Sequence, residues 1–306
     1  VLLDTHQYQL PGRRYECLAA CGAAAAVAAT AGTALDQLQR FLDAHRGDWC
    51  FGHLAYDLKQ ETEGAPTRHA NPVGFADLHF FRPQVVLQLS TTRLTIGVLA
   101  GNPDDVWQQL VQTSDAVFDN ATPLQLQQRV SKEAYLQNVD AIRGHILRGD
   151  CYELNYCMEF FAEGVQRNPV ALYRALTAVS PTPFAAFYRV HHSYLLCASP
   201  ERYLKKTGNQ LVSQPIKGTR PRNLQQASAD AALRRQLQQN SKERSENVMV
   251  VDLVRNDLSR ICEPGSVAAT ELFGIYSFPQ VHQMLSTVEG RLRPDVSFTD
   301  IIRATF

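Results

Sequence analysis

The sequence predicts a mixed fold of strands and helices. Strand patterns occur in pairs around short polar turns, as in residues 85–89 and 93–99 around the turn 90–92. Two other segments, 131–149 and 240–261, carry apolar residues at helical spacing instead. The 306 residues are 45% hydrophobic, which is enough for a substantial core in one large or two small domains.

Charge and cysteine content exclude several classes of protein. The chain has 30 basic and 30 acidic residues, whereas a protein that binds nucleic acid or a membrane surface normally shows a basic excess. The seven cysteines are scattered and form no CxxC pair, so neither a zinc site nor a disulfide framework is indicated. The alanine-rich segment 15–35 is too weakly apolar to span a membrane. We therefore expect a protein of the reducing cytoplasm.

The first third of the chain is expected to contain several strands. Residues 49–57 have a strand pattern in which Gly52 leaves room for another backbone to approach. His53 has no partner at metal-ligand spacing, which favours a hydrogen-bonded histidine over a metal ligand. Residues 103–117 can form a short helix, and the segment 118–128 has little pattern and is interpreted as a connection.

The middle of the chain is expected to mix helices and strands. Ser131 is placed to cap a helix that ends at Gly149, a residue type that commonly terminates helices. A strand is predicted for 151–157, a helix for 169–178 and a buried strand for 184–188.

The strongest functional signal is Lys217, which follows a strand pattern over 210–216. Gly218 lets the backbone pass close to a ligand, and two fixed positive charges follow at Arg220 and Arg222. Cationic neighbours favour the neutral form of an amine, and a neutral amine is a nucleophile or a base. The alternative is a solvated basic turn.

A carboxylate is predicted close to this lysine. The apolar strand 193–198 leads to Glu201, so an acidic residue also stands at a strand end. A hairpin that joins this strand to 210–216 would bring Glu201 and Lys217 into one neighbourhood.

Two further carboxylates lie at the start of the predicted helix 240–261. Glu246 lies three positions after Glu243, so both face one side of its first turns, a geometry suited to a hard cation such as magnesium. Asn240 and Glu243 also have the spacing of a capping box. The alternative is therefore a solvated acidic turn that complements the helix dipole.

Three sequence strings resemble the chorismate-utilising enzymes of the anthranilate synthase component I family. They are Ala-Ser-Pro-Glu-Arg at 198–202, Pro-Ile-Lys-Gly-Thr-Arg-Pro at 215–221, and Glu-Arg-Ser-Glu-Asn at 243–247, which is followed by Asn-Asp-Leu at 256–258. Their order and spacing match the family over residues 131–306. Within the family, the chain most resembles component I of aminodeoxychorismate synthase, and component I of anthranilate synthase is the close relative.

The resemblance implies a fold and a reaction. The fold would be α+β, a two-layer, mostly antiparallel β-sandwich with peripheral helices, in which residues 1–128 form an N-terminal portion and 129–306 a chorismate-binding catalytic portion. The reaction would convert chorismate and ammonia to 4-amino-4-deoxychorismate, the precursor of para-aminobenzoate in folate biosynthesis. The chain has no glutaminase signature, so the ammonia would come from solution or from a separate glutamine amidotransferase subunit.

The resemblance also implies roles for single residues. Glu201 matches the general acid that protonates the departing hydroxyl. Lys217 matches a lysine that attacks the ring as a covalent nucleophile, and the alternative is a lysine that only positions a substrate carboxylate. Glu246 and Glu243 match carboxylates that hold Mg²⁺ over the substrate. The remaining matches are the substrate-binding positions Gly218, Thr219 and His282.

Some features depart from the family or leave alternatives open. Glu153 stands where water-using relatives have a lysine base, which argues against isochorismate or salicylate synthesis. The family continues beyond residue 306 with a Gly-Gly-Ser loop, and Val1 is not an initiator, so the chain is expected to be truncated at both ends. Anthranilate synthase component I is the enzyme alternative, disfavoured by Lys217. A catalytically silent binding subunit or fragment is the other, disfavoured by the intact site residues.

Overall fold

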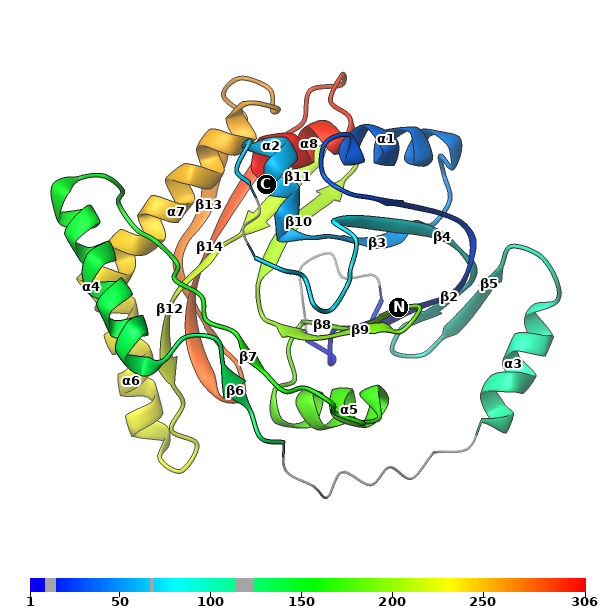
Figure 1. Cartoon of the computed structure of the whole chain (residues 1–306), viewed down its shortest axis with the longest axis horizontal. Coiled ribbons are helices and arrows are strands. Elements are labelled where there is room, and N and C mark those ends of the chain that lie inside the picture. Colours follow the sequence, from blue (N-terminus) through cyan, green and yellow to red (C-terminus); the bar gives the residue numbers. More distant parts are fainter. Residues whose placement is uncertain (9–14, 67–68, 114–123) are drawn as a thin grey trace. The chain divides into compact units, whose positions relative to one another are not determined.

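The computed structural model describes residues 1–8, 15–66, 69–113 and 124–306. Helices and antiparallel sheets make up this chain (Figure 1), which confirms the predicted α+β class. Two compact units are formed. The larger unit comprises Val1–Ser114 and Tyr173–Phe306, and the smaller unit comprises Asp115–Leu172. The division into 1–128 and 129–306 that the resemblance implies stays a prediction.

A seven-stranded antiparallel sheet occupies the N-terminal part of the larger unit. Its strands lie in the order β3-β4-β2-β1-β8-β9, and β5 pairs with β4. The predicted hairpin over 85–99 is confirmed as the β4–β5 pair, and the alanine-rich segment forms β2, which pairs with β4. The strands are β1 (Leu2–Asp4), β2 (Cys17–Ala29), β3 (Phe51–Leu54), β4 (Leu78–Leu89), β5 (Leu94–Val98), β8 (Phe184–Val190) and β9 (Ser193–Ser199).

Three helices accompany this sheet along the chain: α1 (Ala34–Ala44), α2 (Lys59–Thr62) and α3 (Pro103–Gln112). The helix predicted from residue 103 is thus present up to Gln112. Its predicted continuation from residue 114 and the first part of the connection 118–128 lie outside the described residues. In the part of the chain that the structure describes, we find no helix with the length and apolar character needed to cross a membrane.

Gly52 in β3 confirms the close backbone approach that the sequence predicts. A β-carbon at Gly52 would lie 2.1 Å from the carbonyl oxygen of His79, so only glycine fits there. The adjacent His53 has both ring nitrogens within hydrogen-bond distance of protein groups, the hydroxyl of Tyr188 at 3.2 Å and the carbonyl of Ala76 at 2.9 Å. This arrangement confirms a hydrogen-bonded histidine.

A five-stranded antiparallel sheet forms much of the rest of the larger unit. Its strands lie in the order β10-β11-β14-β12, and β13 pairs with β14. The predicted hairpin of 193–198 with 210–216 is wrong, because β9 pairs with β8 in the other sheet and β10, a strand that the sequence did not suggest, pairs with β11. The chain therefore passes from one sheet to the other at Pro200 and Glu201. The strands are β10 (Arg202–Thr207), β11 (Gln210–Gln214), β12 (Ile216–Pro221), β13 (Ala268–Ser277) and β14 (Val281–Arg291).

Helix α7 (Ser241–Ser259) divides its apolar residues between the core and a cavity. Leu258 is buried with Leu211 of β11 and Val288 of β14, and each such leucine contributes about 2 kcal/mol of burial free energy. Val250 and Val254, which the spacing places on the same face, are only half-buried and line the cavity described below. The other helices here are α6 (Ala227–Gln239), which also packs against β12 and β14, and α8 (Phe298–Thr305).

The smaller unit contains α4 (Lys132–Arg148), the helix predicted from Ser131. The Ser131 hydroxyl accepts a hydrogen bond from the backbone N–H of Ala134 at 3.2 Å, and Gly149 ends the helix with a φ of +83°. Both predicted ends of this helix are thereby confirmed.

The strand predicted at 151–157 is wrong. This stretch has no regular structure. Its Tyr156 ring packs against Tyr135 of α4 with ring centroids 5.0 Å apart, and the Tyr156 hydroxyl accepts a hydrogen bond from Asn138 at 2.6 Å. Tyr156 thus packs on a helix rather than in a sheet, and Tyr152 is exposed. The unit also holds β6 (Gln127–Gln128) and β7 (Phe160–Phe161), which pair, and α5 (Pro169–Val179) leads out of it as predicted.

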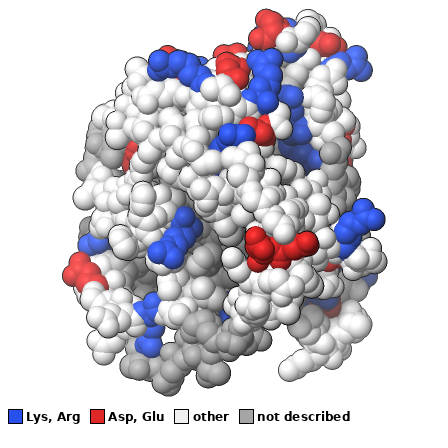
Figure 2. All heavy atoms as spheres, turned by 90° about the vertical axis from the view of Figure 1, so that its right-hand side faces the viewer, with Lys and Arg blue, Asp and Glu red and all other residues white. Residues whose placement is uncertain are grey.

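Charged side chains are mixed on the face of the molecule seen in Figure 2. Lysine and arginine lie singly or in small groups there, interspersed with aspartate and glutamate among uncharged residues. The described residues on this face therefore form no continuous basic patch.

Candidate functional site

The strand that carries Lys217 is irregular. β12 begins directly after Pro215, which has no N–H to offer a strand ladder. Its register against β14 shifts between Ile216 and Thr219, and regular pairing resumes at Thr219. Lys217 and Gly218 lie within this shifted stretch, so their backbone is displaced from the regular pattern of the sheet.

Gly218 brings the strand against the helices rather than leaving open space. Its φ is +97°, a conformation that favours glycine. A β-carbon at Gly218 would lie 3.0 Å from the Glu243 carboxylate and 3.3 Å from the Leu237 side chain. The close approach expected at this glycine is therefore made by α6 and α7, and it places Gly218 and Glu243 side by side.

Glu201 lies next to the start of β12. Its carboxylate oxygen Oε1 accepts a hydrogen bond from the backbone N–H of Ile216 at 2.9 Å, and its own N–H donates to the Ser199 hydroxyl at 3.2 Å. The carboxylate is thus fixed beside the residue that precedes Lys217. The predicted neighbourhood of Glu201 and Lys217 is present, although the pairing expected to create it is not.

Both carboxylates of the α7 start have cationic partners. The side chain of Asn240 accepts the N–H of Glu243 at 3.0 Å, which confirms the cap. The Asn240 N–H donates to the carbonyl of Leu237 instead of Glu243, so the reciprocal bond of a capping box is not formed. The Glu243 carboxylate, 13% exposed, pairs with Arg220 of β12 at 3.3 Å, and the Glu246 carboxylate, 34% exposed, pairs with Lys242 at 2.8 Å. Glu243 therefore links α7 to the strand of Lys217.

The two arginines after Lys217 are also paired. Arg220 contacts Glu243, and Arg222 donates to both carboxylate oxygens of Asp230 at 2.9 Å. A cation with a carboxylate partner acts only weakly on groups farther away, because the two charges largely cancel. Each of these arginines is therefore largely neutralised by its carboxylate partner.

The donor atoms of Glu243 and Glu246 can be compared with those that a magnesium ion requires. Over the described ranges, no group of three or more His, Cys, Asp or Glu side chains is placed to hold a metal. Magnesium, however, is commonly bound through one or two protein carboxylates together with water and substrate oxygens. Glu243 and Glu246 fit that kind of site, provided that Arg220 and Lys242 release them. Their metal-binding role stays a prediction.

His282 of β14 is enclosed in the protein, with 1% exposure. Its Nδ1 lies 2.8 Å from the Ser277 hydroxyl, and its Nε2 lies 3.0 Å from the carboxylate of Asp230 on α6. Hydrogen bonds from Arg222 are the main cause that lowers the pKa of Asp230 to about 2, and the N–H of Asn223 adds a further hydrogen bond. The predicted contact of His282 with a substrate stays a prediction, and the contacts seen are to protein groups.

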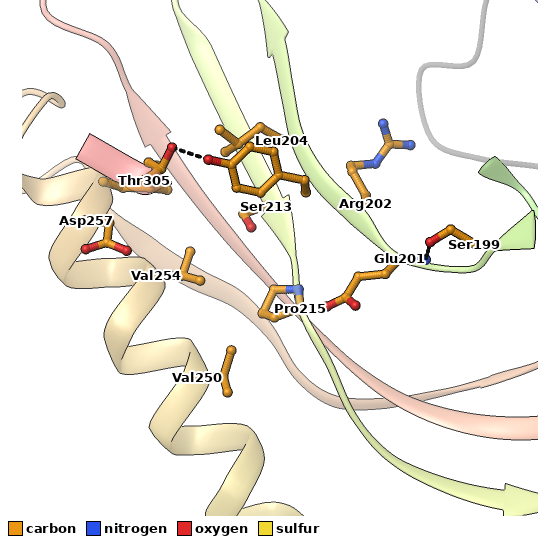
Figure 3. A pocket seen from close by; sticks show the side chains of 12 residues that line it. Ser199, Glu201, Arg202, Leu204, Ser213, Pro215, Val250, Val254, Asp257 and Thr305 are labelled. Atoms are coloured by element: carbon orange, nitrogen blue, oxygen red, sulfur yellow. Dashed lines mark hydrogen bonds between the residues drawn. The ribbon is translucent and has the colours of Figure 1, made fainter. Parts of the chain in front are cut away.

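A cavity of about 410 Å³ adjoins Glu201 (Figure 3). It lies between α7 on one side and strands β10 and β11 on the other. Glu201 lies at one end, and Asp257 of α7 lies toward the other, near Thr305 of α8. The lining residues are Ser199, Glu201, Arg202, Tyr203, Leu204, Ser213, Pro215, Val250, Val254, Asp257, Leu258 and Thr305.

Sequence reasoning missed two acidic residues of this region. Asp257 belongs to the Asn-Asp-Leu string that supports the resemblance, and that string was the available signal for it. Burial is the main cause that raises the pKa of Asp257. Asp230 carried no signal, because nothing in the sequence relates it to Arg222 or His282.

Comparison with protein families gives one match over nearly the whole chain. The family model described as chorismate binding enzyme matches residues 5–306. Aminodeoxychorismate synthase of Streptomyces griseus is 38% identical over an alignment of 274 residues, and the match covers 83% of this chain and 37% of that protein. Aminodeoxychorismate synthase component 1 of Salmonella typhimurium is 30% identical over 259 residues, 83% of this chain and 56% of that protein. The chain thus spans between about a third and somewhat over half of the length of these relatives.

Comparison with solved structures supports the fold. Anthranilate synthase component I from Streptococcus pneumoniae TIGR4 superposes with a TM-score of 0.79 at 23% identity, over 97% of this chain and 73% of that one. A putative 2,3-dihydroxybenzoate-specific isochorismate synthase from Bacillus anthracis has a TM-score of 0.63 at 17% identity, over 99% of this chain and 71% of that one. The TM-scores establish a shared fold. Because the identities are this low, the reaction has to be inferred from the residues of the site.

Proposed function

The chain belongs to the chorismate-binding enzyme family, and from this premise we propose that the protein converts chorismate and ammonia to 4-amino-4-deoxychorismate. This compound is the precursor of para-aminobenzoate in folate biosynthesis. The observation that carries the proposal is the Glu201 carboxylate, held 2.9 Å from the N–H of Ile216 and so beside Lys217. Relatives named aminodeoxychorismate synthase, at 30–38% identity, support the same reading.

Lys217 and Glu201 divide the work of displacing the ring hydroxyl. The Lys217 amine forms a bond to C2 of the ring, both ring double bonds shift by one position, and the bond from C4 to its hydroxyl breaks. Glu201 gives its proton to that hydroxyl, which leaves as water. Ammonia then forms a bond to C4, the double bonds shift back, and Lys217 leaves C2 as a neutral amine. The new ammonium group at C4 loses one proton, which restores Glu201.

Magnesium is the proposed cofactor, and Glu243 and Glu246 are the residues that would hold it. When bound, the ion supplies a positive charge that orients the ring carboxylate of chorismate and draws electron density from the ring. The backbone at Gly218 and Thr219 lies along the same strand as Lys217 and is proposed to contact the substrate. His282 contacts Asp230, and Asp230 binds Arg222, the residue that follows this strand, so His282 helps to hold the strand in place.

The proposed source of ammonia is a separate glutamine amidotransferase subunit in the cytoplasm. The name component 1, carried by the Salmonella typhimurium relative, describes one part of a multi-component enzyme. The partner would release ammonia from glutamine, and this chain would supply the chorismate site.

Product analysis of the full-length protein tests the proposal. The protein is supplied with chorismate, Mg²⁺ and an ammonium salt, with and without an added aminodeoxychorismate lyase. We expect para-aminobenzoate that forms only when the lyase is present. Anthranilate formed without the lyase would contradict the proposal in favour of the tryptophan branch. A protein without turnover and without Mg²⁺-dependent chorismate binding would be a silent binding subunit.

A further inference from the structure

The cavity between α7 and strands β10 and β11 is lined by groups that accept hydrogen bonds. Ser213 of β11 is 6% exposed, and its hydroxyl has no hydrogen-bond partner among the described residues although it faces this space (Figure 3). The hydroxyl is accessible from the cavity, so a ligand with a matching polar group can form a hydrogen bond with it. Ser213 therefore points to a polar ligand in the cavity.

A second hydroxyl of the cavity is oriented as an acceptor. The Thr305 hydroxyl donates its hydrogen to the carbonyl of Ile301 at 2.8 Å. It can therefore only accept from the Tyr203 hydroxyl, which lies 2.7 Å away (Figure 3). Once Tyr203 has donated its hydrogen, its remaining lone pair can only accept a hydrogen bond.

Two carboxylates add negative charge to this acceptor-rich space. Glu201 uses Oε1 for Ile216. Asp257 accepts a hydrogen bond from the Asn256 side chain at 3.3 Å, and its one ion-pair partner among the described residues is Arg260, at 3.9 Å. Arg202 is the basic residue among those that line the cavity. Its guanidinium is bound to Gln214 at 2.9 Å, packs over a phenyl ring, and points away from Asp257 in Figure 3. The cavity therefore favours a small cation that carries hydrogen-bond donors.

We propose that this cavity is an ammonium subsite, which binds ammonium at Asp257, Ser213 and Tyr203 and opens toward Glu201 and Lys217. The inference rests on the proposed function, in which ammonia is the second substrate. Ammonium has four N–H donors and no acceptor, so it complements these groups. Chorismate carries two carboxylates, which the acidic lining repels, and it binds on the outer side of Glu201 beside Lys217.

The bound ammonium must lose one proton before its nitrogen can attack carbon. The N–H bond breaks, the proton passes to the Asp257 carboxylate, and neutral ammonia and a neutral carboxylic acid remain; the acid later returns the proton to solvent. Burial raises the pKa of Asp257, which favours this neutral pair. The walls toward Glu201 are apolar, formed by Val250, Val254 and Pro215, and they admit ammonia more readily than ammonium.

Steady-state kinetics of the full-length protein tests the subsite. Chorismate is held at saturation, ammonium is varied, and potassium chloride keeps the ionic strength constant. Asp257→Asn is expected to raise the KM for ammonium about tenfold, the equivalent of one charge-assisted hydrogen bond, and to lower kcat because the amide cannot take the proton, with the KM for chorismate unchanged. The matched control is Asp252→Asn, which removes an exposed carboxylate of the same helix and should leave all three constants unchanged.

A second pair of variants tests the path without altering a charge. Val254→Phe fills the cavity and is expected to raise the KM for ammonium, whereas Leu253→Phe, at a position 59% exposed on the same helix, is not. An unchanged KM for ammonium in both Asp257→Asn and Val254→Phe overturns the inference, as does an equal rise in the KM for chorismate. These results count against the subsite alone when the wild type forms product from ammonium. A wild type that forms none contradicts the proposed function itself.

Discussion

Each of the two large sheets encloses a histidine network, and the two networks differ in charge. In the seven-stranded sheet, the hydroxyl of Tyr188 lies 2.7 Å from Nδ1 of His79 and 3.2 Å from Nδ1 of His53. In the five-stranded sheet, His282 contacts the carboxylate of Asp230, which also binds the guanidinium of Arg222. Among the described residues, the first network contains no carboxylate or guanidinium, whereas the second contains an ion pair.

The difference in charge between the two networks corresponds to their positions, because, in the described part of the chain, only the second network contacts the strand of the candidate site. Burial is the main cause that lowers the pKa of His79 and raises that of Tyr188, so both groups are kept neutral. Arg222, in contrast, directly follows β12, and its backbone and side chain hold the β13–β14 turn through Gln280 and Phe278. The neutral network therefore joins strands to one another, whereas the ionic network fixes the strand that carries Lys217.

The largest effect is expected from breaking the ionic network at its buried histidine. His282→Ala leaves Asp230 and Ser277 without one partner each and should lower the free energy of unfolding by about 3 kcal/mol. Urea denaturation measures this loss, and kcat should fall with it because β12 loses support. The control is His192→Ala in the exposed β8–β9 turn, expected to change stability by less than about 0.5 kcal/mol. A loss for His282→Ala no larger than for the control would contradict the comparison.

A smaller effect is expected from the strand itself. Gly218→Ala should cost about 2 kcal/mol, because its φ of +97° disfavours alanine and the new methyl would meet the Glu243 carboxylate at 3.0 Å. Gly208→Ala is the matched control, since its φ is +60° and a β-carbon there has no neighbour within 4 Å. It should cost about 1 kcal/mol. Thermal unfolding of both variants separates the cost of backbone strain from the cost of the close contact with α7. Equal losses of stability in the two variants would show that the contact with α7 contributes nothing.

The neutral network should tolerate change better. Tyr188→Phe removes the hydroxyl that both histidines contact and should cost about 1–2 kcal/mol, with kcat unchanged. Tyr56→Phe, at a position 78% exposed, is the control and should have no measurable effect. A fall in kcat for Tyr188→Phe beyond that explained by unfolded protein would show that the first sheet also supports the site.

Acid should weaken the two networks in separate pH ranges. Both His79 and Asp230 have a lowered pKa in the fold, so each contributes stability above its ordinary value and loses that contribution as the pH falls through the folded value. For His79 the loss begins near 6.5, and for Asp230 it begins near 3.8 and extends to about 2. His79→Gln should flatten the upper range of a stability profile and Asp230→Asn the lower range. A variant that alters the other range would contradict the assignment.

What the sequence predicted correctly depends on neighbours along the chain. The cap at Asn240, the helix end at Gly149 and the close approach at Gly52 follow from residue types at fixed spacing. The contacts that were missed join distant segments. The pairing of β9 with β8 and the contact of Asp230 with His282 depend on which strands become neighbours, and periodicity does not encode that choice.

The candidate site shows the same division. Lys217 and Glu201 were found because each stands in a short recognisable string. The cavity could not be predicted, because its lining comes from five separate elements and their connections. The strand predicted at 151–157 failed because Tyr156 packs on α4, a contact that strand propensity alone does not exclude.

The most direct test of the account is whether Lys217 becomes covalently attached to the substrate. The full-length protein is incubated with chorismate and Mg²⁺ without ammonia, and the mass of each lysine-containing peptide is measured. In the wild type, we expect the Lys217 peptide to gain the mass of chorismate less one water. The control Lys206→Ala should give the same adduct, because the Lys206 side chain binds the carbonyl of Gly208. The corresponding peptide of Lys217→Ala should gain no mass. Product formation by Lys217→Ala at the wild-type rate, with no adduct in any sample, would contradict the account.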